Sequence, residues 1–284
     1  MDSDDAETTQ AVSTLLKTTL LLVALAACHR TGRETVTLKQ SSSKPEQADL
    51  TLHTKPPAKK KKKKIYLTFD DGPNRGTNKV LHIMQQESVP VTFFIVGEHV
   101  FASIGQKQTW DSLMIAQHIE LCNHSYSHAH NHYANWYRHP GSVVDDFKRS
   151  EDSLQFSNTI CRTPGRNAWR IDTLQFTDLK KSKTAIDSLQ QAGFTIMGWD
   201  LEWEYNGKDL CLKNSADEVL RKIDSLFAHQ QTRSPECLVL LAHDQVYADA
   251  DDSAELHDFI RKLKMNDAYE LELVSNYPGV KVMP

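Results

Sequence analysis

The sequence predicts an α/β fold, a distorted (β/α) barrel with about seven parallel strands. From Ile65 onward, short and almost continuous apolar runs alternate with amphipathic stretches. Strands that are apolar along their whole length are typical of a parallel sheet buried on both faces. Several of the runs end in ionisable residues, at the position where barrel enzymes carry their chemistry. A doubly wound open sheet is the alternative fold.

The expected strands are short and evenly distributed. They cover the apolar runs at 65–69, 91–96, 119–122, 159–161, 195–199, 238–241 and 271–274. Between them lie helix-length stretches, of which 216–227 and 253–263 are clearly amphipathic. Seven strand–helix units over about 220 residues fit a closed or nearly closed barrel.

The composition is that of a globular protein with a large core. Of the 284 residues, 39% are hydrophobic and 25% are charged, which excludes a largely disordered or collagen-like chain. Five cysteines are too few for a fold built on disulfide bonds. The sequence has no apolar run of about 18 residues, so we predict no membrane-spanning helix.

Charge divides the chain into three parts. Residues 1–27 carry a net charge of −3, residues 28–64 carry +8, and residues 65–284 carry −9. The middle part contains Ser and Pro residues followed by six lysines at 59–64, which predicts an extended, disordered basic linker. Contact of these lysines with anionic lipid or polymer is the alternative. The acidic body argues against binding to nucleic acid.

The N-terminal segment resembles an export signal. Residues 18–27 form a short apolar run after Lys17, and Leu25-Ala-Ala-Cys28 resembles the processing box of bacterial lipoproteins. This resemblance implies a signal peptide at 1–27 and a lipid on Cys28. The protein would then be exported and lipid-anchored in the bacterial cell envelope, periplasmic or surface-facing. The acidic segment before the run departs from that pattern, and a fortuitous apolar helix is the alternative.

Polar residues follow five of the predicted strands. They are Asp70-Asp71, Asn123-His124, Arg162, Asp200 and His243-Asp244. Because parallel strands of a barrel end at the same rim, we expect these side chains to converge. His124 and His128 are four residues apart, so on a helical turn they share a face and can hold one cation. A carboxylate from Asp70 or Asp71 would complete a set of ligands that suits a divalent metal.

Four motifs occur in order along this part of the chain. They are Thr68-Phe-Asp-Asp-Gly-Pro73, His124-Ser-Tyr-Ser-His128, Arg162-Thr-Pro164 and Leu241-Ala-His-Asp244. Together they resemble the motifs of the polysaccharide deacetylases, the NodB-homology group of carbohydrate esterase family 4. The resemblance covers most of residues 65–284 and implies that this segment is the catalytic domain. It also implies a distorted (β/α) barrel, in agreement with the alternation of strands and helices.

The resemblance implies a role for each motif residue. Asp70 would be the general base, Arg162 would pair with it, and His243 would be the general acid. Zn²⁺ is the expected metal, with Co²⁺ or Ni²⁺ as alternatives. Its ligands would be Asp71, His124 and His128. A metal lowers the pKa of bound water toward about 7 and polarises a carbonyl, and histidine is a suitable proton donor near neutral pH.

The chain departs from the family pattern on the substrate side of the third motif. Gly165 stands where an aromatic residue usually follows the proline, although its N–H can still stabilise an oxyanion. We therefore expect Trp169, together with Trp199, to line the substrate groove. Arg166 and Arg170 either favour an anionic glycan or pair with neighbouring carboxylates.

Three further questions remain open at the level of sequence. Either Asp200 or Glu202 could be the carboxylate that supports His243. The nearby histidines 130, 132 and 139 either shift the metal site or form an exposed loop. The cysteines at 122, 161, 211 and 237 either form disulfides, as an exported protein allows, or stay buried thiols.

The sequence therefore predicts a metal-dependent hydrolase that removes acetyl groups from N-acetylated sugars of a polysaccharide, either peptidoglycan or chitin-like oligomers. One alternative keeps the chemistry and is an O-acetyl esterase acting on xylan or another glycan. The alternative of another class is a catalytically inactive glycan-binding lipoprotein. We expect a monomer whose partners are the polysaccharide and, through the lipid anchor, the membrane.

Overall fold

The computed structural model describes residues 61–281. The expected signal peptide at 1–27 and the expected linker up to residue 60 lie outside the described residues, so both stay predictions. Within the described part of the chain, no helix is long and apolar enough to cross a membrane.

The first strand begins slightly earlier than the sequence suggested. β1 (Lys63–Gly72) starts two residues before Ile65, inside the expected linker. The backbone N–H groups of Lys63 and Lys64 donate to carbonyl oxygens at 2.9 and 2.8 Å, so these two lysines already belong to the sheet. The run of six lysines at 59–64 does not show in the sequence where the linker ends and the first strand begins.

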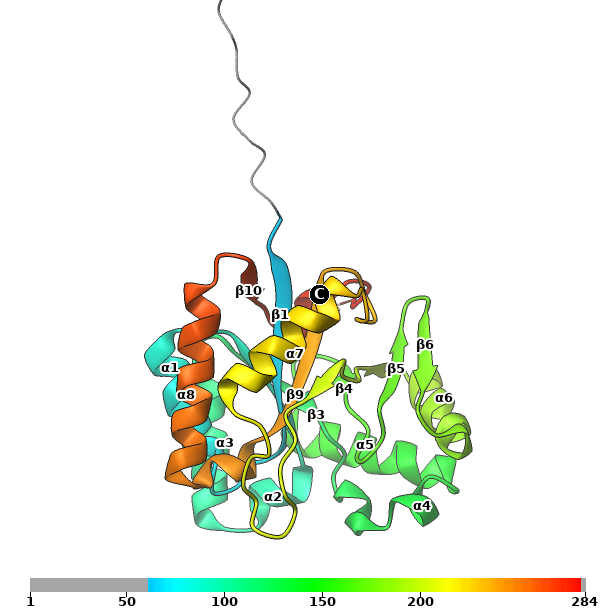
Figure 1. Cartoon of the computed structure of the whole chain (residues 1–284). Coiled ribbons are helices and arrows are strands. Elements are labelled where there is room, and N and C mark those ends of the chain that lie inside the picture. Colours follow the sequence, from blue (N-terminus) through cyan, green and yellow to red (C-terminus); the bar gives the residue numbers. More distant parts are fainter. Residues whose placement is uncertain (1–60, 282–284) are drawn as a thin grey trace, which may run out of the picture. The chain divides into compact units, whose positions relative to one another are not determined.

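Seven parallel strands form the centre of the fold. In spatial order they are β7 (Thr195–Ile196), β4 (Ile160–Cys161), β3 (Ile119–Asn123), β2 (Val91–Ile95), β1, β9 (Cys237–His243) and β8 (Leu201–Glu202). β7 and β8 lie at opposite edges of this row, yet only residues 197–200 separate them in the chain. The sheet therefore curls until its edges approach each other, which confirms the predicted distorted barrel (Figure 1).

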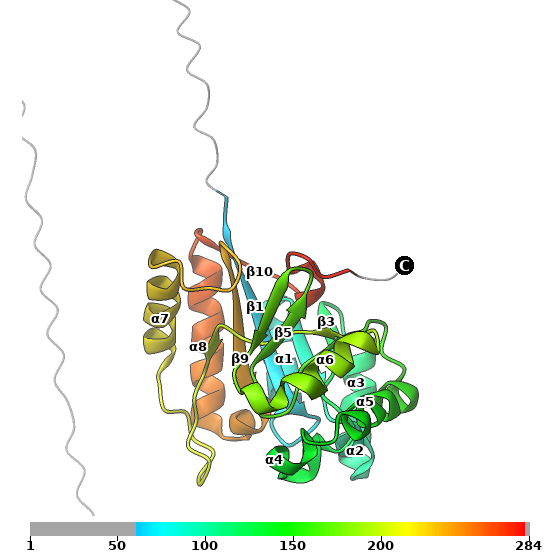
Figure 2. The same cartoon turned by 90° about the vertical axis from the view of Figure 1, so that its right-hand side faces the viewer.

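Three strands lie outside this row. β5 (Ala168–Ile171) and β6 (Leu174–Thr177) form an antiparallel hairpin beside β7, visible in Figure 2, which the sequence did not predict. Among the described strands, β10 (Tyr269–Leu271) pairs with the first residues of β1 alone. The expected strand at 271–274 therefore overlaps β10 by one residue, and the seventh barrel strand is the two-residue β8 instead.

Helices cover the outside of the curled sheet, with α1, α3 and α8 on one side and α5 and α6 on the other (Figure 1). The helices are α1 (Thr77–Glu87), α2 (Gly97–Phe101), α3 (Ile104–Ile115), α4 (Tyr133–Trp136), α5 (Pro140–Leu154), α6 (Lys183–Gln191), α7 (Ala216–Ala228) and α8 (Ala250–Met265). Short 3-10 turns are η1 (His128–Asn131), η2 (Lys180–Ser182), η3 (Asp244–Ala248) and η4 (Val274–Asn276). α7 and α8 contain the two stretches predicted as amphipathic helices.

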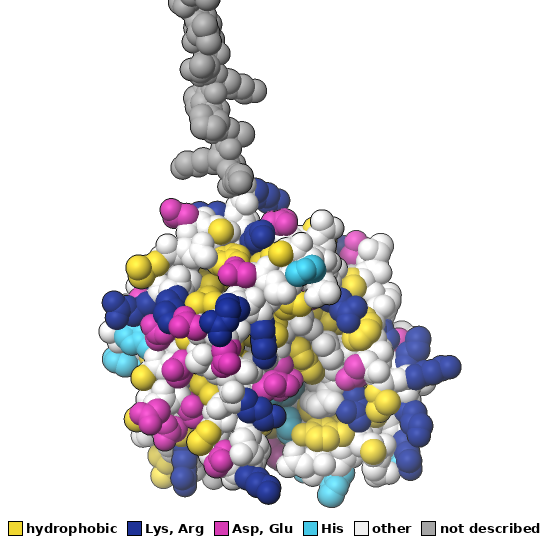
Figure 3. Space-filling model, in the orientation of Figure 1, with side chains coloured by type: hydrophobic (Ala, Val, Ile, Leu, Met, Phe, Trp, Pro, Cys, Tyr) yellow, Lys and Arg dark blue, Asp and Glu magenta, His cyan; other side chains and the backbone are white. Residues whose placement is uncertain are grey.

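The exposed face of α7 and α8 carries charges of both signs. Figure 3 shows basic and acidic side chains interspersed over these helices. Lys262 of α8 illustrates the pattern, because its ammonium group lies 2.6 Å from a carboxylate oxygen of Asp217 and from one of Asp258. Such exposed pairs contribute little to stability, so the helices are held mainly by their buried apolar faces.

Aromatic packing supports the carboxyl end of β1. The Phe69 ring stacks on Phe93 of β2 with centroids 5.5 Å apart and meets Tyr247 of η3 edge-on at 5.7 Å. All three rings are fully buried. Since Phe69 immediately precedes Asp70, this packing fixes the end of the strand from which the first motif projects.

We predict that Phe69→Ala lowers the free energy of unfolding by about 3–5 kcal/mol, because it leaves a cavity in the core. Phe101→Ala is the matched control, since Phe101 is 54% exposed, and it should change stability by less than about 0.5 kcal/mol. Denaturant unfolding of both variants measures the difference, and equal losses would contradict this account of the core.

Candidate metal centre and catalytic cleft

The predicted motif residues converge at the carboxyl ends of the parallel strands. A cavity of about 250 Å³ opens there, and it is lined by Asp70, Asp71, His124, His128, Tyr133, Thr163, Gly165, Trp199, Glu202, Tyr205, Leu241 and His243. A larger groove of about 640 Å³ lies between α1 and α3, but none of the predicted site residues lines it. The small cavity is therefore the candidate site.

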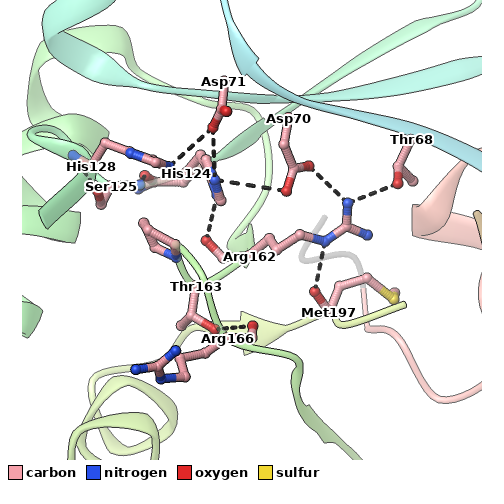
Figure 4. Close-up of polar contacts among 12 residues, drawn as sticks. Thr68, Asp70, Asp71, His124, Ser125, His128, Arg162, Thr163, Arg166 and Met197 are labelled. Atoms are coloured by element: carbon pink, nitrogen blue, oxygen red, sulfur yellow. Dashed lines mark hydrogen bonds and ion pairs between the residues drawn. The ribbon is translucent and has the colours of Figure 1, made fainter. Parts of the chain in front are cut away.

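Asp70 and Asp71 are adjacent in sequence but face different partners. Asp71 has a φ of 74°, in the left-handed region, and the pairing of β1 with β2 shifts between Asp70 and Gly72. This break in the strand turns the second carboxylate away from the first. Figure 4 shows Asp70 directed toward Arg162, with a longer contact to His124, and Asp71 directed toward both histidines.

Arg162 is fully buried and is the central donor beneath the cleft. Its guanidinium donates to Asp70 Oδ1 at 2.8 Å and to Thr68 Oγ1 at 2.7 Å. It also donates to the backbone carbonyls of Met197 at 3.1 Å and Gly198 at 2.9 Å. These two carbonyls belong to the segment that joins the two edges of the barrel. One side chain thus holds the Asp70 carboxylate and the closing segment together.

Asp71, His124 and His128 form one cluster of potential metal ligands. Asp71 Oδ1 lies 3.0 Å from His128 Nε2 and 3.4 Å from His124 Nε2. A ligand atom of each of the three residues lies within 4.8 Å of the other two. Burial raises the pKa of the Asp71 carboxyl, but the two imidazoles outweigh this effect and hold the pKa well below its usual range. The position between these groups therefore favours positive charge.

The hydrogen bonds behind the imidazoles show that this cluster fits a metal cation. His124 Nδ1 lies 2.8 Å from the backbone oxygen of Arg162, and His128 Nδ1 lies 3.2 Å from Asn131 Oδ1. Carbonyl oxygens only accept, so each imidazole donates through Nδ1 and turns the lone pair of Nε2 toward Asp71. When both imidazoles are neutral, these lone pairs and the Asp71 carboxylate fit a cation between them, and this arrangement is typical of metal-binding histidines.

His243 lies at the end of β9, on the opposite side of the cleft from the histidine pair. Its ring packs against Tyr205 with centroids 5.1 Å apart, and its Nδ1 is buried without a hydrogen-bond partner among the described residues. Glu202 of β8 lines the same cavity. Burial raises the pKa of the Glu202 carboxyl, and the charge of His243 partly opposes that rise.

Asp200 is not brought to His243. Its carboxylate accepts hydrogen bonds from the backbone N–H groups of Arg233 at 2.7 Å and Val239 at 2.8 Å. Val239 precedes His243 on β9 by four residues, so the Asp200 carboxylate is held beside the first half of β9 and not beside its end, where His243 lies. Burial raises the pKa of Asp200 to about 6. Of the two carboxylates that the sequence left open, only Glu202 lies in the cleft.

The substrate side of the cleft differs from the expectation for Trp169. Trp169 is fully buried on β5 and packs against Tyr277, with ring centroids 5.5 Å apart. The expected loop is a strand at this point, and the Trp169 indole faces the core. Gly165 and Trp199 do line the cavity. Gly165 has a φ of 60°, and a Cβ there would lie 3.3 Å from the ring of Tyr133. Tyr133 therefore provides the aromatic wall at this position.

The two arginines after the third motif differ in their partners. Arg170 is buried, and its guanidinium donates to Asp187 Oδ1 at 2.7 Å. This ion pair connects the hairpin with α6. Arg166 donates to Ser182 Oγ at 3.1 Å and has no carboxylate partner among the described ion pairs. The pairing alternative thus holds for Arg170 alone.

The remaining open residues lie outside the cluster. The side chains of His130, His132 and His139 are exposed, which agrees with the interpretation of this stretch as an exposed histidine loop. The four cysteines of the described residues, 122, 161, 211 and 237, are all free. Cys122 and Cys161 pack in different hydrophobic clusters, which explains why neighbouring strands do not bring them together.

Comparison with known proteins shows which family this part of the chain is similar to. Residues 58–196, just under half of the chain, match the family described as polysaccharide deacetylase. The match includes the first three motifs, from Asp70 to Arg162. Residues 58–196 are thus similar to the polysaccharide deacetylase family, and the curled α/β barrel agrees with the fold that the sequence resemblance implied.

Two relatives show how far the sequence similarity extends. The peptidoglycan-N-acetylglucosamine deacetylase of Bacillus cereus is 25% identical over 208 residues, which cover 70% of this chain and 67% of the relative. The chitin disaccharide deacetylase of Vibrio alginolyticus is 24% identical over 201 residues, which cover 49% of this chain and 47% of the relative. The matched region thus spans about half to two thirds of the length of these relatives.

Solved structures show the same fold. The catalytic domain of a peptidoglycan N-acetylglucosamine deacetylase from Eubacterium rectale has a TM-score of 0.55 at 22% identity, covering 79% of this chain and 96% of that chain. A family 4 carbohydrate esterase from Streptomyces lividans in complex with acetate has a TM-score of 0.54 at 19% identity, covering 78% of this chain and 98% of that chain. At this level of identity the likeness establishes the fold alone.

We predict that Arg162→Met lowers the free energy of unfolding by about 3–5 kcal/mol, because it leaves the buried Asp70 carboxylate without its partner. The double variant Arg162→Met with Asp70→Asn should recover part of that loss, since no buried charge then remains. Denaturant unfolding of both variants and of Asp70→Asn completes the cycle. Additive effects of the two substitutions would contradict a coupling between these side chains.

Proposed function

We propose that this protein is a metal-dependent deacetylase that removes acetyl groups from N-acetylated sugars of a polysaccharide, such as peptidoglycan or chitin-like oligomers. The observation that carries the proposal is the divergence of two adjacent carboxylates. Asp71 faces two imidazoles, whereas Asp70 lies 2.8 Å from a buried guanidinium. This arrangement provides one carboxylate for a cation and a second for proton transfer.

The metal would be held by three side chains. Imidazole and carboxylate groups suit Zn²⁺, with Co²⁺ or Ni²⁺ as alternatives. The proposed ligands are Asp71, His124 and His128. A bound divalent ion supplies Lewis acidity toward the acetyl carbonyl and lowers the pKa of water beside it.

Asp70 is the proposed general base. Its carboxylate is buried, lines the cleft, and lies 3.7 Å from His124 Nε2, next to the proposed cation site. Arg162 donates a hydrogen bond to Asp70 Oδ1 at 2.8 Å and so holds the carboxylate in place to accept a proton from the attacking water. Arg162 acts through Asp70 and is a positioning residue.

His243 is the proposed general acid on the other side of the cleft. A leaving amine needs a proton, and an imidazole at this position can donate it. Glu202 would stabilise the protonated imidazole by its negative charge. The backbone N–H of Gly165 is the proposed oxyanion donor, and Trp199 would contact the sugar through its ring.

Acetate release from defined substrates tests the proposal. Protein loaded with Zn²⁺ should release acetate from N-acetylglucosamine oligomers or from peptidoglycan, and Asp70→Asn should lower the rate by about 10²–10⁴-fold, the usual contribution of a general base. Acetylated xylan is included as an ester substrate. Faster release from the ester would favour an O-acetyl esterase, and absence of release from all three substrates would contradict the proposal.

A second prediction assigns the carboxylate that supports His243. Glu202→Gln should lower kcat about tenfold, equivalent to ~1.4 kcal/mol, because the protonated imidazole loses a nearby charge. Asp200→Asn is the matched control, since that carboxylate bonds only backbone N–H groups in this structure, and it should leave kcat within twofold. A larger effect of Asp200→Asn would contradict this assignment.

We also propose that the protein is exported and anchored through a lipid on Cys28. The proposal is supported by the apolar run at 18–27 and the Leu25-Ala-Ala-Cys28 pattern. When the whole chain is expressed in a bacterium fed a labelled fatty acid, the label should attach to the protein and be lost in Cys28→Ser. Equal labelling of both proteins would contradict the anchor.

A further inference from the structure

The turn that follows His128 has an unusual backbone. The residues of η1 (His128–Asn131) have φ values of 50°, 56°, 45° and 61°, all in the left-handed region, and none is glycine. Left-handed backbone costs about 1–2 kcal/mol per residue for most side chains. A run of such residues persists only where surrounding contacts enforce it, and it is typical of functional sites.

This turn folds Asn131 back onto His128. Asn131 Oδ1 lies 3.2 Å from His128 Nδ1 and 3.1 Å from the hydroxyl of Tyr133. The same hydroxyl lies 3.4 Å from His128 Nδ1. Because the amide oxygen only accepts, it can receive hydrogen bonds from both groups at once. His128 is thereby left with its Nε2 directed at Asp71, 3.0 Å away.

Tyr133 is itself fixed by the cleft. Its ring meets the His128 ring edge-on, with centroids 5.7 Å apart and an interplanar angle of 86°. On the other side it lies against Gly165, where a Cβ would come within 3.3 Å of the ring. The tyrosine therefore connects the His128 imidazole with the loop that follows Arg162.

We propose that Asn131 and Tyr133 are positioning residues that fix the tautomer and orientation of His128 toward the cation. The proposal rests on the proposed metal site. The other histidine needs no such device, because His124 Nδ1 donates to a backbone carbonyl in the core. His128 lies closer to solvent and depends on side chains from its own turn for the equivalent support.

Cation affinity tests the proposal without using catalysis. The metal-free full chain is titrated with Zn²⁺ in competition with a chelating indicator. Asn131→Gly removes the acceptor but tolerates the positive φ, and it should weaken Zn²⁺ binding by about 10–100-fold. Tyr133→Phe keeps the ring and should cause a smaller loss. Asn131→Asp restores an acceptor oxygen and should bind Zn²⁺ at least as tightly as the wild type.

His130→Gly is the matched control within the same turn. His130 has a φ of 45° and an exposed side chain, so glycine there relieves the same backbone strain without touching His128. It should leave Zn²⁺ affinity unchanged, and thermal unfolding of each metal-free variant verifies that it is folded.

Two results would overturn the proposal: Zn²⁺ affinity unchanged in both Asn131→Gly and Tyr133→Phe, or an equal loss in His130→Gly. A wild type that binds Zn²⁺ tightly but releases no acetate would contradict only the proposed function. A wild type that binds no Zn²⁺ would contradict both.

Discussion

The buried guanidinium of Arg162 is the interaction on which the rest of the site depends. A charged group without solvent is tolerated only when it is paired and its N–H groups are satisfied. Here it donates hydrogen bonds to a carboxylate, a hydroxyl and two backbone carbonyls. Its Cζ atom also lies 4.1 Å from the centroid of the Phe94 ring. Two of these acceptors belong to residues 197–198, which join the barrel edges. Closure of the barrel and the charge at the first motif therefore depend on the same side chain.

The local backbone converts two adjacent aspartates into two separate groups. In a regular strand, successive side chains point to opposite faces of the sheet, and one of them would leave the cleft. The left-handed conformation of Asp71 and the shifted pairing with β2 keep both carboxylates at the rim, facing different partners. Left-handed backbone recurs from His128 to Asn131, so strained backbone occurs both at Asp71 and at His128, two of the potential metal ligands.

Much of the barrel and of the motif cluster could be predicted from the sequence, because short apolar runs that alternate with helix-length stretches and the polar residues that follow these runs are both visible in it. The two-residue strand β8 and the hairpin of β5 and β6 left no such pattern, since their pairing is set by tertiary contacts. Trp169 was misplaced for that reason. The choice between Asp200 and Glu202 also needed the structure, because their spacing alone does not show which carboxylate the backbone of β9 captures. Asn131 gave no signal in the sequence, because its contact with His128 depends on a left-handed turn.

The central claim is that the two aspartates have different partners, one a cation and the other a guanidinium. A crystal structure of the Zn²⁺-loaded protein, with anomalous scattering measured at the zinc edge, tests this most directly. The account predicts one anomalous peak, in contact with Asp71, His124 and His128, with the Asp70 carboxylate still hydrogen-bonded to Arg162. A peak coordinated by Asp70, or one located away from the two histidines, would contradict it.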